Sequence, residues 1–331
     1  MKAICTLFFL LVISLQARTW TDVNGRKIEA EMVRPDGDQV VVSMAGKEIN
    51  IPRNKLSKED IDFVDEWKPP ELSLAGQLIV KGGKANMIER DYSSETIKSL
   101  EALKGKNSAK SPEESDRESN EPETKLKLAV AVPADFDPMK APQVMIVCAP
   151  VNNEKERVAG NFRSFNTFAK SCADHGWVCI TVDSNTGRPR NTSAAYQEAI
   201  TLLEKEWRGM AKARYCTGGF SGGSKSCWAP AAWLIKRKNP VVGVFMAGCN
   251  HSFATIFRQH YKAPPEPYHN LKVFITNGTT DNIAPLSKVG DVAKDLKSAG
   301  IHNIRQEQFE GGHTVHPQHV DDALTWFNEA K

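Results

Sequence analysis

The sequence predicts an α/β protein: a mostly parallel sheet with helices on both faces, preceded by a small all-β barrel module. Three observations lead to this prediction. Strand-like apolar runs alternate with amphipathic helical stretches over residues 126–331, short β-prone runs separated by turn residues occupy residues 18–67, and a polar segment divides them. Near-continuous apolar strands separated by helices are typical of a parallel sheet buried on both faces.

The composition fits one large domain and a smaller one. The 331 residues include 43 Lys and Arg against 40 Asp and Glu, a formal net charge of +3. Nucleic-acid binding usually needs a clustered basic face, and this near-balance offers no case for one. We therefore expect no nucleic-acid partner.

The first residues, MKAICTLFFLLVISLQA, run from a lysine through an apolar stretch to the small residue Ala17. This order is typical of a signal peptide, and the apolar stretch is too short to span a bilayer comfortably. We predict that residues 1–17 are removed and that the protein is exported, periplasmic or secreted, with no membrane span afterwards. A retained membrane anchor is the alternative.

Six cysteines remain after that cleavage, all between Cys148 and Cys249. An even count in an exported protein allows disulfides. Most of the six lie in or beside apolar runs, which favours buried free thiols, with one bridge as the alternative. No Cys-x-x-Cys or Cys/His zinc spacing occurs, so we expect no metal.

Residues 18–67 begin with β-prone runs at Lys27–Val33, Gln39–Ser43 and Lys47–Ile51, separated by glycine-containing turns. Ser57 then begins a short helix, and Asp60 three residues later completes an approximate capping box. The pattern predicts a small barrel of at most five strands with one helical turn.

The segments RTWTDVNGRKIEAE and GKEINIPRNKLSKEDIDFVDEW resemble the Sla-homology module, a small barrel found at the N-terminus of many exported bacterial proteins. The resemblance covers residues 18–67 and implies a binding or spacer module whose partner would be a protein or a cell-envelope component. It implies no chemistry.

Residues 68–125 are predicted to be a charged, largely disordered linker. The run KGKNSAKSPEESDRESNEPETK is rich in charged residues, Ser and Pro and lacks aromatic residues, so it cannot bury enough apolar surface to order itself. The earlier stretch LSLAGQLIV is a candidate strand that could pack on either neighbouring domain.

Seven strands are predicted after the linker: Leu126–Val132, Val144–Ala149, Trp177–Val182, Arg214–Gly219, Val241–Ala247, Lys272–Asn277 and Ile304–Phe309. The predicted helices are Asn161–His175, Ser193–Trp207, Ser224–Lys238, Ser287–Ala299 and Pro317–Ala330. Ligands of such sheets lie at the carboxyl ends of the strands, so the loops that follow the strands are where functional residues are expected.

One strand end reads Gly219-Phe220-Ser221-Gly222-Gly223, the pattern G-x-S-x-G between a strand and a helix. The turn is so tight that only Gly fits two residues on either side of the serine, and it presents the Ser221 hydroxyl at a helix N-terminus. Ser221 is therefore the predicted nucleophile.

Residues of about 126–331 resemble the α/β-hydrolase family through this motif and its strand–turn–helix context. In that family an acid and then a histidine follow later strands. LKVFITNGTTDNIAP ends in a turn that carries Asp281, and IRQEQFEGGH ends in a Gly-Gly turn that carries His313. The resemblance implies a Ser221, His313 and Asp281 triad; Asp183, at the end of another strand, is the alternative acid.

Two further histidines follow His313 at spacings of three residues. His316 precedes Pro317, a favoured first helical residue, and is expected to cap the last helix. His319 lies in the first turn of that helix and is expected to be solvated. A metal cluster is the alternative, but Pro317 interrupts a common helical face and no carboxylate or cysteine completes a zinc set.

The oxyanion formed during acyl transfer needs two backbone N–H donors. Gly222, just after the nucleophile, is the first. The family often has His-Gly at the second position, where this chain has Ala149-Pro150, and Pro150 has no N–H. We assign Val151, with Asn152 as the alternative.

Phe220, Trp228 and Asn152 are the predicted substrate-binding residues. Phe253, Phe257 and Tyr261 are further candidates for an acyl pocket, with an ordinary core role as the alternative for these aromatic residues. Arg188 and Arg190 lie on a loop where they could meet an anionic substrate, although a solvated loop is the favoured interpretation.

The predicted function is that of an exported serine hydrolase, without a cofactor, that cleaves small-molecule or polymeric carboxylic esters through an acyl-enzyme. A serine peptidase or a polyester depolymerase of the same fold is one alternative. A non-catalytic binding protein with a degenerate hydrolase fold is the other.

Overall fold

The computed structural model describes residues 17–68, 71–98, 125–148, 165–183 and 189–329, without the side chains of 183 and 189–192. The chain divides into two compact units, Met1–Glu71 and Leu72–Lys331. Nearly all of the predicted signal peptide lies outside the described residues. Within the described ranges no helix combines the length and the apolar character that crossing a membrane requires.

The N-terminal unit is a four-stranded antiparallel sheet in the order β1-β2-β3-β4, followed by a helix. Its elements are β1 (Arg18–Thr21), β2 (Lys27–Asp36), β3 (Gln39–Met44), β4 (Lys47–Pro52), the 3₁₀ turn η1 (Arg53–Lys55) and α1 (Lys58–Glu66). The three predicted strands are confirmed. β1 was not predicted, because its four residues are too few to form a recognisable pattern.

The predicted helix cap of this unit is also confirmed. The Ser57 side chain accepts a hydrogen bond from the Asp60 backbone N–H at 3.2 Å. The buried Asp60 carboxylate accepts a bond from the Thr21 N–H at 2.6 Å and forms an ion pair with Arg18 at 2.7 Å. Asp60 therefore joins the start of α1 to β1.

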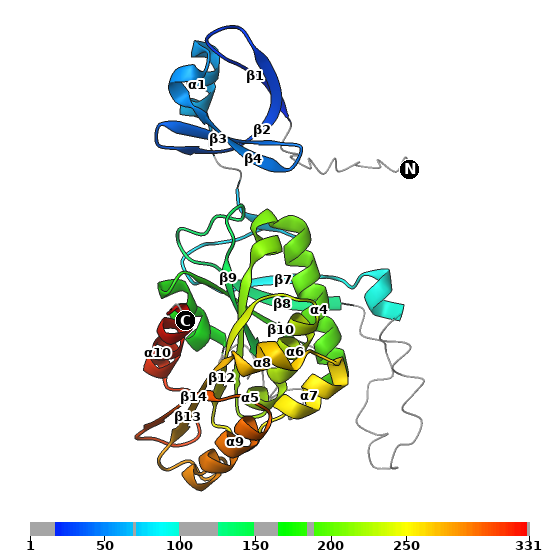
Figure 1. The fold of residues 1–331 in the computed structure, drawn as a ribbon, viewed down its shortest axis with the longest axis vertical. Helices are drawn as coiled ribbons and strands as arrows, with labels where there is room; N and C mark the ends of the chain where they lie inside the picture. Colours follow the sequence, from blue (N-terminus) through cyan, green and yellow to red (C-terminus); the bar gives the residue numbers. More distant parts are fainter. Residues whose placement is uncertain (1–16, 69–70, 99–124, 149–164, 184–188, 330–331) are drawn as a thin grey trace, which may run out of the picture. The chain divides into compact units, whose positions relative to one another are not determined.

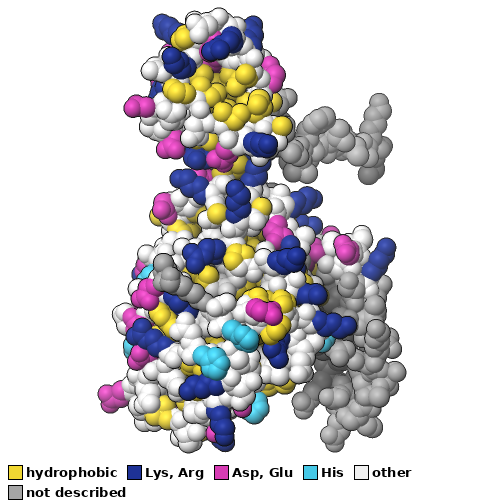
Figure 2. Space-filling view, in the orientation of Figure 1, with side chains coloured by type: hydrophobic (Ala, Val, Ile, Leu, Met, Phe, Trp, Pro, Cys, Tyr) yellow, Lys and Arg dark blue, Asp and Glu magenta, His cyan; other side chains and the backbone are white. Residues whose placement is uncertain are grey.

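The core of the N-terminal unit is built around Trp20. Its indole N–H donates to the Ala30 carbonyl at 2.9 Å, and its ring meets Phe63 of α1 edge-on at 5.8 Å. Hydrophobic side chains also gather on the face of this unit that Figure 2 shows. On the face of the second unit that Figure 2 shows, cationic and anionic side chains are interspersed.

The second unit contains an eight-stranded sheet in the order β14-β13-β12-β11-β9-β10-β8-β7 (Figure 1). The strands are β7 (Asn86–Asp91), β8 (Lys125–Ala131), β9 (Gln143–Cys148), β10 (Trp177–Asp183), β11 (Arg214–Phe220), β12 (Val241–Ala247), β13 (Lys272–Gly278) and β14 (Asn303–Phe309). The six strands β10, β9, β11, β12, β13 and β14, in their order across the sheet, pair in parallel. β8 runs antiparallel to both β10 and β7. The mostly parallel sheet and its seven predicted strands are confirmed.

The eighth strand, β7, lies within residues 68–125, so the prediction of a linker over that whole range is wrong. β7 pairs with β8 along its whole length, and the short hairpin of β5 (Ser73–Leu74) and β6 (Gln77–Leu78) also belongs to the second unit. Only Ile88 of β7 is buried, so this edge strand shows no apolar run in the sequence. The second unit begins at Leu72, and residues 99–124 of the predicted linker lie outside the described residues.

Helices cover both faces of this sheet, as the sequence predicts (Figure 1). They are α4 (Pro189–Glu206), α5 (Gly222–Ser226), α6 (Trp228–Lys236), α7 (Ala254–Tyr261), α8 (Pro265–His269), α9 (Leu286–Ser298) and α10 (Pro317–Asn328), with the 3₁₀ turn η3 (Arg208–Lys212) after α4. α4, α6 and α9 share one hydrophobic cluster with the sheet, and α10 and the helix at residues 165–174 share the other. α7 and α8, which lie between β12 and β13, were not predicted.

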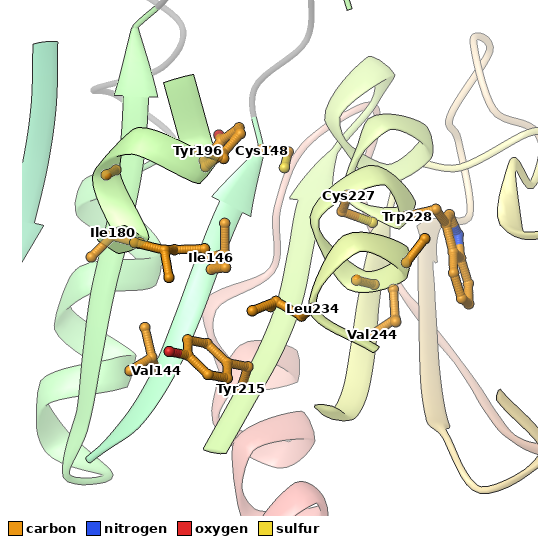
Figure 3. Packing of buried hydrophobic residues seen from close by; sticks show 14 of the residues in the cluster. Val144, Ile146, Cys148, Ile180, Tyr196, Tyr215, Cys227, Trp228, Leu234 and Val244 are labelled. Carbon is orange, nitrogen blue, oxygen red and sulfur yellow. The ribbon is translucent and has the colours of Figure 1, made fainter. Parts of the chain in front are cut away.

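All six described cysteines are free and buried, as the thiol interpretation predicts. Cys148, Cys227 and Cys249 lie in the cluster of one sheet face, part of which Figure 3 shows, while Cys172, Cys179 and Cys216 lie in the cluster of the other. Burial raises the pKa of the Cys148 thiol to about 12. These thiols are core residues.

Candidate active site

Ser221 lies in the turn between β11 and α5, in a backbone conformation that residues other than glycine rarely adopt. Its φ is 55° and its ψ is −118°. Such a conformation costs about 1–3 kcal/mol and persists where the surroundings hold it. The Ser221 N–H donates to the Ala247 carbonyl at 2.9 Å, which ties the turn to the end of the neighbouring strand β12.

The glycine before this turn is needed because two backbone segments come close to it. A Cβ on Gly219 would lie 2.4 Å from the Cys148 carbonyl oxygen and 2.6 Å from the carbonyl carbon of Gly223. The first glycine of the G-x-S-x-G pattern therefore allows α5 to pack directly against β11, as the pattern predicts.

Asp281 lies in the turn after β13 and is almost fully buried, with 3% of its surface exposed. Its Oδ1 accepts hydrogen bonds from the backbone N–H groups of Ile283 and Ala284, both at 2.8 Å. Burial raises the pKa of the Asp281 carboxyl, but the hydrogen bonds from Ala284, His313 and Ile283 outweigh it, so the pKa lies below the ordinary value of 3.8. Asp281 is therefore ionised at neutral pH, with Oδ2 left for His313.

His313 follows β14 and faces this carboxylate. Its Nδ1 lies 2.7 Å from Asp281 Oδ2, and 17% of its side chain is exposed. Because an ionised carboxylate only accepts, Nδ1 carries the proton of this bond, and the neutral ring has its lone pair on Nε2. Nε2 is buried and has no hydrogen-bond partner among the described residues, Ser221 included. The ring is therefore held in the tautomer that a general base requires.

The turns that carry Asp281 and His313 are joined through their backbones. The Thr280 N–H donates to the Gly311 carbonyl at 2.9 Å, and a Cβ on Gly278 would lie 2.2 Å from that same oxygen. Gly278 thus permits an approach that any larger residue would prevent. The predicted Gly-Gly turn after the last strand is present, and this contact with the preceding strand is what places it.

Phe220 and Gly248 form the other side of the His313 site. The Phe220 ring lies 4.6 Å from the imidazole, centroid to centroid, at an interplanar angle of 44°. Gly248, with a φ of +56°, lies so close that a Cβ would be 2.8 Å from Phe220 Cε2 and 2.9 Å from His313 Cε1. Gly248 was not predicted to be a site residue, because its only signal in the sequence is its place directly after the apolar strand β12.

The predicted substrate-binding and oxyanion residues have different outcomes. Gly222 is the first residue of α5, where a backbone N–H has no acceptor within the helix. Val151 and Asn152 lie outside the described residues. Phe220 is half-buried and contacts His313, so its contact with substrate stays a prediction.

The assignment of Trp228 to substrate binding is not supported. Trp228 is fully buried at the start of α6 and stacks on Tyr268 with ring centroids 6.2 Å apart. Figure 3 shows it among the side chains of the hydrophobic core. The sequence alone does not distinguish a core tryptophan from one that lines a pocket at the start of a helix. In the structure Trp228 is a core residue.

Asp281 is the carboxylate that contacts His313, while the side chain of the alternative acid, Asp183, lies outside the described residues. The two later histidines lie in a separate cluster with Phe309. His316 occupies the N-cap position of α10 as predicted, although its side chain makes no capping hydrogen bond.

The prediction that His319 is solvated is wrong. His319 is buried, with 9% of its surface exposed, and its Nδ1 lies 2.6 Å from Thr276 Oγ1 of β13. The first turn of α10 packs against the sheet, so a histidine there faces inward. Burial, followed by the charge of His316, lowers the pKa of His319 below 6.5. The described residues contain no cluster of three potential metal ligands.

The N-terminal residues match a known family, and solved structures are similar in fold to the second unit. Residues 14–71 match the family model described as SLA1 homology domain 1, SHD1. The N-terminal unit is an SHD1 domain. The Sla-homology module expected from the sequence is confirmed, and the strand order and the tight strand–serine–helix turn of the second unit are those of an α/β-hydrolase fold.

Solved structures with a similar fold include esterase 2 of Thermogutta terrifontis phosphoramylated by tabun, which is 18% identical. The alignment covers 63% of this chain and 89% of the esterase, with a TM-score of 0.41. An α/β serine hydrolase homologue from Coxiella burnetii is 14% identical over 61% of this chain and 90% of its own, with a TM-score of 0.42. No curated protein sequence matches the chain.

Proposed function

We propose that this protein is a serine hydrolase that cleaves carboxylic esters, with Ser221 as nucleophile, His313 as general base and Asp281 as the residue that orients it. One observation carries the proposal. His313 Nδ1 is bonded to the buried Asp281 carboxylate at 2.7 Å, and His313 Nε2 is buried without a partner among the described residues. A histidine held in this way is prepared to accept a proton at Nε2.

The reaction would proceed in two halves. The Ser221 oxygen attacks the ester carbonyl carbon while its proton passes to His313 Nε2, and the imidazolium is stabilised by Asp281. The proton then moves to the leaving alcohol oxygen as the C–O bond breaks, which leaves an acyl group on Ser221. Water attacks the acyl carbon in the same way, giving the carboxylic acid and restoring the serine.

The negative charge on the carbonyl oxygen would be stabilised by backbone N–H groups. The Gly222 N–H is the first donor, because it directly follows the nucleophile. The second donor is assigned to Val151, with Asn152 as the alternative. Loss of one such donor costs about 3 kcal/mol of transition-state stabilisation.

Two observations favour an enzyme over a binding protein with the same fold. Ser221 is held at a φ of 55°, a strained conformation of the kind that is concentrated at active sites. Gly248 and Gly278 leave room for the His313 ring and for the turn that carries it. Binding alone would not need this combination.

A fluorophosphonate probe, which reacts covalently with activated serine, tests the proposal. We expect it to label the wild-type protein and not Ser221→Ala. Absence of labelling in well-folded wild-type protein would contradict the proposal. Hydrolysis of 4-nitrophenyl esters compared with aminoacyl anilides then separates an esterase from a peptidase.

We also propose that the protein is exported and that its SHD1 domain binds a protein or a cell-envelope component. The order of a lysine, an apolar run and a small residue over residues 1–17 supports export. Sequencing the N-terminus of protein isolated from its natural compartment tests this. A mature chain beginning near Arg18 is expected, and a chain that retains Met1 would contradict it.

A further inference from the structure

Asn277, near the end of β13, has a buried side chain that no step of the proposed reaction uses. None of its surface is exposed. Its Nδ2 donates to the Ala284 carbonyl at 2.7 Å and to the Cys249 carbonyl at 3.3 Å. A buried amide costs free energy unless it is hydrogen-bonded, so these two carbonyls hold the side chain in place.

The orientation of the Asn277 amide follows from its two acceptors. A carbonyl oxygen only accepts a hydrogen bond, so the group that faces both carbonyls is the NH₂ group. The reversed amide would place Oδ1 against two other oxygen atoms. Oδ1 is buried and has no hydrogen-bond partner among the described residues, so the bonds of this side chain within them are those of Nδ2.

The bond to Ala284 acts on the turn that carries Asp281. The Ala284 N–H donates to Asp281 Oδ1 at 2.8 Å, and the carbonyl of the same residue accepts from Asn277. Asn277 therefore fixes a residue that in turn fixes the carboxylate. The other oxygen of that carboxylate bonds His313 Nδ1 at 2.7 Å.

The bond to Cys249 acts on the loop after β12. Gly248, the residue before Cys249, lies directly against the His313 imidazole. The Gly248 N–H donates to the carbonyl of Thr276, which precedes Asn277 in β13, at 2.9 Å. Two successive residues of β13 thus hold this loop, one by its backbone and one by its side chain. The amide therefore joins the turn of the candidate acid to the loop on which the candidate base rests.

We propose that Asn277 is a positioning residue, which holds the Asp281 carboxylate in its place against His313 by joining these two segments. This inference rests on the function proposed above. Because none of its surface is exposed, Asn277 acts through Asp281 and does not contact the substrate. Loss of the amide should therefore lower kcat and leave KM unchanged.

Asn277→Leu tests the proposal, because it removes both hydrogen bonds and keeps most of the side-chain volume. We expect kcat for a 4-nitrophenyl ester to fall about tenfold at an unchanged KM. A displacement of about 1 Å would cost about 100-fold, and the backbone bonds of the two segments limit the movement to less. Asn277→Ala, which places no apolar atoms beside the two carbonyls, should give the same result and replaces Asn277→Leu if that variant does not fold. A wild-type kcat in either folded variant, or a rise in KM that accounts for the whole loss, would overturn the proposal.

Asn86→Leu is the matched control. The Asn86 amide donates to three backbone carbonyls, those of Val80 at 2.9 Å, Lys84 at 3.0 Å and Val130 at 3.1 Å. Asn86 belongs to β7, at the edge of the sheet far from β13. Its replacement should lower the melting temperature and leave kcat unchanged. A fall in kcat equal to that of Asn277→Leu would show a general effect of instability and overturn the positioning role.

A second measurement determines whether Asn277 acts through Asp281. The rate constant of fluorophosphonate labelling is compared with and without Asn277→Leu, in wild type and in Asp281→Asn. We expect Asn277→Leu to slow labelling about tenfold in the wild-type background and less than about twofold in Asp281→Asn, because residues that act as a unit are not additive. Equal slowing in the two backgrounds would overturn the proposal.

Failure of this proposal is distinguishable from failure of the proposed function. Wild-type protein that hydrolyses no ester and takes no fluorophosphonate refutes the proposed function. Active wild-type protein whose kcat is unchanged in Asn277→Leu refutes only the role of Asn277.

Discussion

Gly248 lies directly against the imidazole of His313. A Cβ at this position would be 2.9 Å from His313 Cε1 and 3.1 Å from Nδ1, the atom that bonds Asp281. The end of β12 therefore forms the surface on which the candidate base rests, although it supplies no reactive group. The site therefore needs a residue without a side chain at position 248 as well as the reactive side chains of the other residues.

Gly248→Ala is expected to lower kcat/KM by about 100-fold, because a displacement of the base of about 1 Å is enough for a loss of this size. The new methyl group would displace the ring, and the φ of +56° would strain any residue other than glycine. Hydrolysis of a 4-nitrophenyl ester measures the effect. Gly290→Ala is the control, because a Cβ there meets open space. Wild-type activity in Gly248→Ala would contradict this account of the site.

The histidines are expected to differ in their effects on activity. His313→Ala should abolish both ester hydrolysis and fluorophosphonate labelling, because no other described side chain bonds Asp281 in its place. His316→Ala should retain most of the activity, since the His316 ring contacts Phe309 and His319. Equal losses in the two variants, or loss of wild-type activity with a chelator, would show that the assignment of roles is wrong.

Asp281 should make stability depend on acid pH. Its pKa is lower in the folded protein than the ordinary 3.8, so the unfolded chain takes up the proton first as the pH falls. This contribution to the free energy of unfolding is complete above about pH 5 and is lost as the pH falls through 3.8 and below. Denaturant unfolding between pH 6 and pH 3 should therefore show a smaller decrease in Asp281→Asn than in wild type. An equal slope in the two proteins would count against the lowered pKa.

His319 should contribute a second pH dependence nearer to neutrality. Burial and the charge of His316 lower its pKa, against the opposing effect of Asp322 and Glu307, so the unfolded chain gains a proton more readily below pH 6.5. Stability from this group is present above pH 6.5 and decreases as the pH falls below it. Between pH 7.5 and pH 5.5 the melting temperature should therefore fall less in His319→Gln than in wild type. A parallel fall in both proteins would indicate that His319 does not titrate differently on folding.

Much of the fold could be predicted because its signals are local. Six of the seven predicted strands of the second unit are largely buried apolar runs, and all seven were recognised within one or two residues at their ends; β14, at one edge of the sheet, buries only Phe309. β7, at the opposite edge, buries only Ile88 and was missed because it lies in the polar segment that was predicted to be a linker. The boundary of the second unit was missed with it, since pairing with β8 is a property of two distant segments.

The sequence by itself determined which residue types follow which strands. The tight glycine turn around Ser221, the order of Asp281 and His313, the SHD1 pattern and the buried thiols all depend on local spacing or on short apolar runs. These features need no knowledge of what lies across the sheet, so they can be read along the chain.

Only the tertiary structure decided which of these residues meet. The 2.7 Å bond to His313 identified Asp281 as the carboxylate of the site, Trp228 and His319 were found to be buried, and Gly248 was brought against His313. The physical reason is that parallel strands bring their carboxyl ends to one edge of the sheet whatever their separation in sequence. Which loops meet at that edge depends on the order of the strands in the sheet, and no single segment of the sequence determines that order.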